Sequence, residues 1–304
     1  MLFAAAANRE LWSGLTSTLE GLTVKYLEFL SRVHELVQPR SYLEIGVRNG
    51  HSIALSKTKS IGVDPAYNIA PEIELGPDVT LRQATSDDFF AEPEPLAPFD
   101  EPTIDLAFID GLHLYEYVLR DFMNTEKYAA PGSVIIFDDI LPRKTVEAAR
   151  DRETRAWTGD VWKIIPTLTR LRPDLVCLQV GTQPTGLLVV LGADPTSTVL
   201  NANYDDLLKQ YVDSEEDPPA EILQRTAAVP PQKILAAPFW SLLRDQRARG
   251  VTREQGLPEL MDTLRTWAAS ELTATQAAAA NAQLAHKKGN PIDLVRRRIA
   301  KLRS

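Results

Sequence analysis

The 304-residue sequence lacks the features that mark several classes of protein. It has a single cysteine, Cys177, so it cannot form a disulfide within the chain, and this is typical of proteins from a reducing compartment. Residues 1–7 are apolar but lack the basic stretch of a secretion signal. No later segment reaches the roughly 18 to 20 apolar residues of a membrane span. The sequence also has no internal repeat. From the lone cysteine and the absence of a signal or a membrane span, we expect a cytoplasmic protein without a membrane partner.

Charge is unevenly distributed along the chain. The net charge is -8, and residues 1–200 carry 18 basic and 28 acidic side chains. Such a surface repels phosphate backbones, so we expect no nucleic-acid partner and favour a small or neutral substrate. Residues 286–304 reverse the sign, with seven Lys or Arg and one acid, Asp293. This tail is either a solvated end or a site for an anionic partner.

The apolar pattern predicts a helix followed by a largely parallel sheet. Apolar residues recur at helical spacing from Tyr26 to Val37, and Pro39 ends that helix. The expected strands are seven short apolar runs: 42–46, 60–63, 79–81, 104–109, 133–137, 175–180 and 187–191. Segments that can form crossovers separate the first five, which favours an α/β fold with a parallel sheet. The Gly- and Pro-containing segment 181–186 indicates that the last two strands form a hairpin.

From Asn201 onward the sequence changes to helical segments interrupted by prolines. Its clearest apolar stripe consists of Leu257, Leu260, Met261, Leu264 and Trp267. We therefore divide the chain into an N-terminal helical cap (1–40), an α/β domain (41–195) and a C-terminal helical extension with the basic tail (196–304). The apolar stripe needs burial, so the extension is expected to close over the substrate, to form a homodimer interface, or both.

A glycine turn follows the first expected strand. Glu44 stands two residues before Gly46, then come Gly50 and Ser52, and the second strand ends at Asp64. Glycines let the backbone approach a ligand closely, and a carboxylate at a strand tip can accept hydrogen bonds from both ribose hydroxyls. Three residues separate the glycines, so this is not the dinucleotide pattern G-x-G-x-x-G, and NAD is disfavoured. An unliganded tight turn is the alternative.

Three carboxylates stand at the ends of later strands. Asp110 follows the fourth strand, and Asp138 and Asp139 follow the fifth. Because the carboxyl ends of parallel strands open onto one crevice, these groups are expected to converge. Oxygen ligands of this kind suit Mg²⁺ or Mn²⁺. His113 comes three residues after Asp110. Alternatively, the aspartate pair caps a helix and the histidine packs against neighbouring tyrosines.

These motifs resemble those of one enzyme family. The order E-x-G-x-x-x-G resembles motif I of class I S-adenosylmethionine-dependent methyltransferases. The carboxylates resemble those of metal-dependent O-methyltransferases of the catechol type and, more closely through Asp-x-x-His, of enzymes acting on sugars of macrolide antibiotics. The resemblance covers residues 42–191 and implies a Rossmann-like seven-stranded sheet with an antiparallel final strand. The catechol type usually has Asp-Asn where this chain has Asp138-Asp139, which makes a catechol substrate less expected.

The resemblance also implies roles for individual residues. For S-adenosyl-L-methionine it implies contacts by Glu44, Gly46, Gly50, Ser52, Asp64, Ser86, Asp87 and Asp110. For Mg²⁺ or Mn²⁺ it implies the ligands Asp110, Asp138 and Asp139, with His113 as general base. Ser86 and Asp87 follow the third strand, where such folds enclose the adenine, but they could equally form the N-cap of the next helix.

The chemistry favours metal-assisted O-methylation. A hydroxyl is a poor nucleophile until a cation lowers its pKa and a base removes the proton, and the methyl group must then lie in line with it. The Asp-x-x-His pattern and two indoles able to stack on sugar rings, Trp157 and Trp162, favour a sugar hydroxyl in an oligosaccharide or glycosylated metabolite, although a buried core role is the commoner one for tryptophan. The alternatives are a phenolic O-methyltransferase, a metal-free N-methyltransferase and a noncatalytic adenosyl-binding protein.

Overall fold

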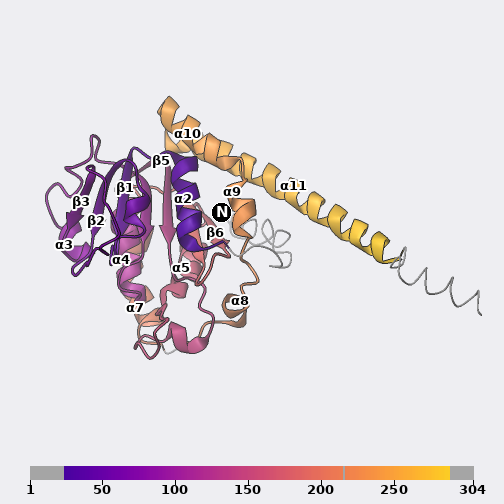
Figure 1. Cartoon of the computed structure of the whole chain (residues 1–304), viewed down its shortest axis with the longest axis horizontal. Helices are drawn as coiled ribbons and strands as arrows, with labels where there is room; N and C mark the ends of the chain where they lie inside the picture. Colours follow the sequence, from indigo (N-terminus) through magenta and orange to yellow (C-terminus); the bar gives the residue numbers. More distant parts are fainter. Residues whose placement is uncertain (1–23, 215, 288–304) are drawn as a thin grey trace, which may run out of the picture.

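A seven-stranded sheet forms the centre of the computed structural model, which describes residues 24–214 and 216–287 (Figure 1). Its strands are β1 (Ser41–Ile45), β2 (Lys59–Val63), β3 (Val79–Arg82), β4 (Ile104–Ile109), β5 (Ala129–Phe137), β6 (Val176–Val180) and β7 (Leu187–Leu191). They lie in the order β3-β2-β1-β4-β5-β7-β6. The first five are parallel, whereas β7 runs antiparallel to both β5 and β6. The predicted class I methyltransferase sheet, with its antiparallel final strand, is confirmed.

The register of the parallel strands brings four strand tips to one level. Ile45 pairs with Val63 on one side and with Ile109 on the other, and Ile109 pairs with Phe137. These are the last residues of β1, β2, β4 and β5. The residues that come next therefore stand in a row along one edge: Gly46, Asp64, Asp110 and Asp138.

Helices cover both faces of the sheet, which explains why its central strands β1 and β4 are buried along their whole length. On one face lie α2 (Tyr26–Val37), α9 (Pro231–Leu235), α10 (Phe239–Arg249) and the start of α11 (Arg253–Lys287). On the other lie α3 (Ser86–Phe90), α4 (Tyr115–Glu126), η3 (Val161–Lys163), α5 (Ile164–Leu171), α6 (Val199–Ala202), α7 (Tyr204–Tyr211) and α8 (Ala220–Leu223). The short turns η1 (Ile53–Leu55) and η2 (Thr145–Ala148) follow β1 and β5.

The helix predicted before the first strand is confirmed as α2. It ends at Gln38, whose left-handed backbone (φ 47°) lets its N–H donate to the carbonyl of His34 just before Pro39. The residues Phe29, Leu30, Val33 and Val37 of its apolar stripe are buried against the sheet.

The C-terminal helices share this face of the sheet with α2. Arg247 of α10 donates to the carbonyls of Val37 and Gln38, and its guanidinium lies 3.3 Å from the carboxylate of Asp105. Beyond this contact α11 runs past the body of the molecule (Figure 1). The domain limits at residues 40 and 195 stay a prediction, and residues 1–23 of the cap and 288–304 of the tail lie outside the described residues. Among the helices that are described, none combines the length and apolarity needed to cross a membrane.

Candidate active site

The turn after β1 packs directly onto the end of β4. Gly46 has a left-handed backbone (φ 93°), and its N–H donates to the carbonyl of Val63 at 2.8 Å. A Cβ atom at Gly46 would lie 1.9 Å from the carbonyl oxygen of Asp110, so no other residue fits there without moving the backbone. Gly50 also has a positive φ, 86°. The two glycines that the sequence predicted to line the cofactor thus belong to one turn, and this turn packs against the carboxyl ends of the parallel strands.

Asp64 faces that turn. Its carboxylate accepts hydrogen bonds from the backbone N–H groups of Arg48 and Ala66, both at 2.7 Å. Arg48 lies between the two glycines and has a left-handed backbone (φ 49°). This places the carboxylate where the sequence predicted it, beside the turn, while its contact with a ribose stays a prediction.

Glu44 and Ser52 lie beneath the turn. Glu44 is fully buried and accepts hydrogen bonds from the hydroxyls of Tyr42 (2.6 Å) and Ser52 (2.7 Å). Burial raises the pKa of Glu44 to about 8, although these hydrogen bonds act in the opposite direction. Both side chains thus support the turn from within, and their direct contact with a cofactor stays a prediction.

Ser86 and Asp87 occupy the first turn of α3. The N-cap is Thr85, whose hydroxyl accepts from the N–H of Asp88 at 3.1 Å, so the expectation that Ser86 or Asp87 caps this helix is wrong. Asp87 forms an ion pair with Arg120 of α4 at 2.7 Å. The side chain of Asp87 is therefore engaged by α4, and its contact with an adenine stays a prediction.

Asp110, His113 and Asp139 form the central cluster of the site. The Nε2 atom of His113 lies 3.2 Å from Oδ1 of Asp110, and its Nδ1 lies 3.0 Å from Oδ2 of Asp139. One ligand atom from each of the three residues lies within 4.8 Å of the others. Burial lowers the pKa of His113, but the two carboxylates outweigh it and raise this pKa to about 11. Without a cation, the imidazole is thus held in its charged form.

Two residues of this cluster have an unusual backbone. His113 has φ 52° and Asp139 has φ 62°, a left-handed backbone conformation that residues other than glycine rarely adopt. Such conformations persist only where the surrounding structure fixes them, and they concentrate at functional sites.

Asp138 stands at the end of β5 as predicted, but it is not one of the three residues whose ligand atoms lie within 4.8 Å of one another. It is buried, and its Oδ1 accepts from the N–H of Asp139 (2.7 Å) and the hydroxyl of Thr185 (3.2 Å). Burial, together with Asp139 and Asp110, raises the pKa of Asp138 well above its usual range. The ligand atoms that come together therefore include His113 in place of Asp138, whose role as a metal ligand stays a prediction that this geometry does not favour.

The two indoles predicted to line an acceptor pocket separate in the structure. The half-buried ring of Trp157 stacks on the ring of His113, with 5.3 Å between centroids and 19° between planes. Trp162 is buried in the core with 4% of its surface exposed. Only Trp157 is part of the site.

Tyr26 lies near the carboxylates of the site, whereas the sequence indicated only that it belongs to a helical stripe. It is the first residue of α2, its N–H donates to the carbonyl of Gln183 at 3.0 Å, and its ring stacks on Phe108. Burial raises the pKa of its phenol, and the neighbouring carboxylates, led by Asp138 and Asp110, raise it further. The only sign of this in the sequence is a tyrosine at the start of the helix that precedes the first strand.

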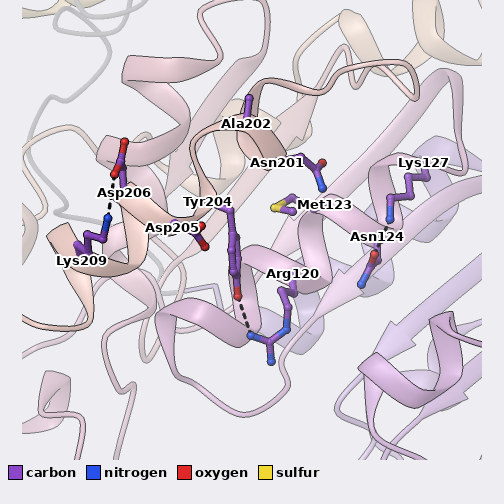
Figure 2. A pocket seen from close by; sticks show the side chains of 10 residues that line it. All are labelled: Arg120, Met123, Asn124, Lys127, Asn201, Ala202, Tyr204, Asp205, Asp206 and Lys209. Carbon is purple, nitrogen blue, oxygen red and sulfur yellow. Dashed lines mark hydrogen bonds and ion pairs between the residues drawn. The ribbon is translucent and has the colours of Figure 1, made fainter.

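A separate cavity of about 560 Å³ lies between α4 and the α6–α7 segment (Figure 2). Its lining includes Arg120, which donates to the hydroxyl of Tyr204 at 2.9 Å, and the lysines Lys127 and Lys209. None of the residues of the Asp110–His113–Asp139 cluster lines it. This cavity is therefore distinct from the candidate active site.

One curated protein is similar to part of this chain. An uncharacterized protein of Acanthamoeba polyphaga mimivirus, R132, is 31% identical over 112 residues, which cover 33% of this chain and 51% of that protein. This chain thus spans about half the length of that curated relative.

Solved structures also resemble the chain at low identity. The O-methyltransferase TomG from Streptomyces achromogenes, in complex with SAM, is 21% identical and covers 62% of this chain and 86% of its own, with a TM-score of 0.42. An O-methyltransferase from Bacillus cereus, in complex with SAH, is 18% identical and covers 62% and 89%, with a TM-score of 0.40. Likeness at this level says nothing of the substrate of this chain.

The family comparison covers the strands that form the candidate site. Residues 43–140 match the model of a methyltransferase domain. They run from β1 through β5 to the loop that carries Asp138 and Asp139. This part of the chain is therefore similar to a methyltransferase domain, and it lies in a sheet with the strand order of the class I fold.

Proposed function

We propose that this chain is an S-adenosylmethionine-dependent O-methyltransferase that uses a divalent cation. One observation supports it above all: the level tips of β1, β2, β4 and β5 place the Gly46 turn, Asp64 and the Asp110–His113–Asp139 cluster along one edge. Donor binding and activation of an acceptor hydroxyl require these two kinds of group side by side.

The turn between Gly46 and Gly50 and the carboxylate of Asp64 fit the donor. The bare backbone at Gly46 leaves a surface without a side chain, and each Asp64 oxygen keeps a lone pair beyond the one that accepts a backbone N–H. The acidic residues at this edge also favour a positively charged ligand. S-adenosylmethionine, when bound, supplies a methyl group on a cationic sulfur.

The donor set of the cluster fits a divalent cation. The carboxylates of Asp110 and Asp139, whose ligand atoms lie within 4.8 Å of each other, suit Mn²⁺ or Mg²⁺. Asp110 and Asp139 would hold the cation, which would supply Lewis-acid activation of a hydroxyl and offset the negative charge that raises the pKa of His113. His113 is then able to take the hydroxyl proton.

We further propose that the acceptor is a sugar hydroxyl. The Asp110-x-x-His113 pattern and the stacked indole of Trp157 support a sugar, whereas the buried Trp162 gives no support. A phenolic acceptor is the second candidate, and it needs less activation because phenols ionise more readily.

Methyl transfer to panels of sugars and phenols, followed by mass spectrometry with and without a chelator, tests this proposal. We expect a methylated sugar product that disappears on chelation and returns with Mn²⁺ or Mg²⁺. A phenolic product insensitive to chelator would contradict both the metal and the sugar. Cofactor binding with no product across both panels would favour a noncatalytic adenosyl-binding protein.

Cofactor binding can be tested without knowing the acceptor. Gly46→Ala places a methyl group against the carbonyl of Asp110, whereas Gly76→Ala enters open space with nothing within 4 Å. We expect S-adenosylhomocysteine to bind Gly76→Ala as it binds the wild type, and its affinity for Gly46→Ala to fall by at least tenfold in calorimetry. Equal affinities for the two variants would place the cofactor elsewhere.

A further inference from the structure

Arg225 connects the C-terminal extension to two loops beside the candidate active site. It lies just after α8 and has a left-handed backbone, with φ 55°. Its Nη1 donates to the carbonyl of Thr182 at 3.1 Å, and its Nη2 donates to the carbonyls of Leu141, at 3.0 Å, and of Pro184. Leu141 comes two residues after Asp139. The guanidinium is therefore fixed next to the loop that follows the cluster.

No carboxylate neutralises the charge of Arg225. Its side chain is half-buried, and among the described residues it forms no ion pair and bonds only to backbone carbonyls. A guanidinium stays charged at neutral pH and has five N–H donors, so three hydrogen bonds leave two donors free. Burial lowers the pKa of Arg225, and the nearby guanidinium of Arg143 lowers it further. Arg225 is thus a fixed positive charge that has lost part of its hydration without gaining a counter-ion.

Arg143 brings a second guanidinium to this place. Its Nε and Nη2 donate to the carboxylate of Glu147 at 3.1 and 2.6 Å. The backbone carbonyl of Glu147 accepts from the N–H of Thr158 at 2.8 Å, next to the Trp157 indole that stacks on His113. One carboxylate therefore accompanies two guanidinium groups, which leaves one positive charge in excess on the loop between the cluster and the stacked indole.

We propose that Arg225, together with Arg143, binds a negatively charged group of the acceptor, either a carboxylate or a phosphate. Guanidinium N–H groups suit the oxygens of both in charge and geometry. The acidic cluster alone repels an anion, so a positive charge beside it is what admits a charged acceptor, although the net charge of residues 1–200 favoured a neutral one. That the bound molecule is the acceptor rests on the proposed function, whereas the binding of an anion does not.

Matched sugars test the proposal by NMR titration of the full chain in the presence of S-adenosylhomocysteine and Mg²⁺. Glucuronate and glucose 6-phosphate carry the two candidate groups, and glucose is the neutral probe. We expect at least one charged sugar to bind about tenfold more tightly than glucose. Arg225→Gln should remove this preference, and Arg32→Gln, at an exposed arginine of α2, should keep it. Binding of charged and neutral sugars with equal affinity in the wild type, or an unchanged preference in Arg225→Gln, overturns the proposal.

Arg225→Lys separates the binding of charge from support of the loops. Lysine keeps the positive charge, but it lacks the planar group that bonds to the three carbonyls. We expect Arg225→Lys to retain most of the preference that Arg225→Gln loses. Loss of the preference in both variants would mean that Arg225 only supports the loops, and the proposal would be wrong.

The Nε–H signal of Arg225 in a chain with ¹⁵N-labelled arginine gives a reading that needs neither a sugar nor a stable variant of the loops. The signal that vanishes in Arg225→Lys assigns it. We expect phosphate or acetate at millimolar concentration to shift this signal saturably, and the signal of Arg32 to show no saturable shift.

This reading decides the proposal if none of the three sugars binds. A wild-type Arg225 signal that neither anion shifts overturns it, whatever the variants do. Saturable anion binding at Arg225 with no methylated product from either charged sugar would support this anion site and contradict the proposed function, so the two failures are distinguishable.

Discussion

Single residues of this chain are held in charge states that water would not favour. His34 shows this away from the site: it is buried beside Tyr42, with ring centroids 4.6 Å apart, and neither ring nitrogen has a hydrogen-bond partner among the described residues. Burial lowers the pKa of His34 to about 4. Glu44, by contrast, is buried with a pKa raised to about 8, so burial opposes the charged form of acid and base alike.

His34 gives a prediction about acid stability. Between pH 6.5 and 4 the unfolded chain binds a proton at this histidine that the folded chain does not, so the free energy of unfolding falls as the pH falls, by up to ~3 kcal/mol. His34→Phe keeps the aromatic contact and cannot titrate. We expect denaturant unfolding to show a shallower loss of stability over this range in His34→Phe, and an unchanged loss in the control His51→Phe, whose side chain is 38% exposed. An acid slope identical to that of the wild type in His34→Phe would refute this account.

At the scale of elements, the strands could be predicted from the sequence and the packing of the C-terminal helices could not. Central strands such as β1 and β4 are buried along their whole length, and all seven strands were recognised as short, largely apolar runs. The stripe from Leu257 to Trp267 showed that a helix face is buried, but periodicity does not say against what. In the structure Leu260 and Leu264 pack in the same cluster as Leu106 and Val134 of the sheet.

Because α10 packs onto the sheet, we expect the C-terminal helices to contribute to the stability of the whole core. Trp240 is 1% exposed, and its indole N–H donates to the carbonyl of Ile234 at 2.7 Å. We expect Trp240→Ala to lower the free energy of unfolding by about 3–5 kcal/mol, because a large buried ring is removed. Circular dichroism during denaturant unfolding measures this loss. Trp157→Ala, at a half-buried ring, controls for the loss of an indole and should cost less. If the main transition of Trp240→Ala is unshifted, these helices form a separate unit.

At the scale of the whole molecule, the sequence predicted the edge on which the site lies but not its full composition. Asp64, Asp110 and Asp139 could be placed because parallel strands end together. Tyr26 and Trp157 reach the site from α2 and from a long loop, and such contacts follow from tertiary packing that one sequence does not reveal. The cluster contains His113 and not Asp138 because of the directions of the two side chains. Asp138 points to Thr185, whereas His113 lies between two carboxylates.

The central claim is that the donor and the cation share this edge, and paramagnetic relaxation by Mn²⁺ tests it most directly. The measurement is the broadening of the ¹H signals of S-adenosylhomocysteine bound to the full chain as Mn²⁺ is added. We predict that the protons next to the sulfur broaden more than those of the adenine. In Asp139→Asn, which removes one carboxylate of the cluster but leaves the Gly46 turn intact, the cofactor should still bind and the broadening should be lost. Bound cofactor whose signals Mn²⁺ leaves unchanged in the wild type would contradict the account.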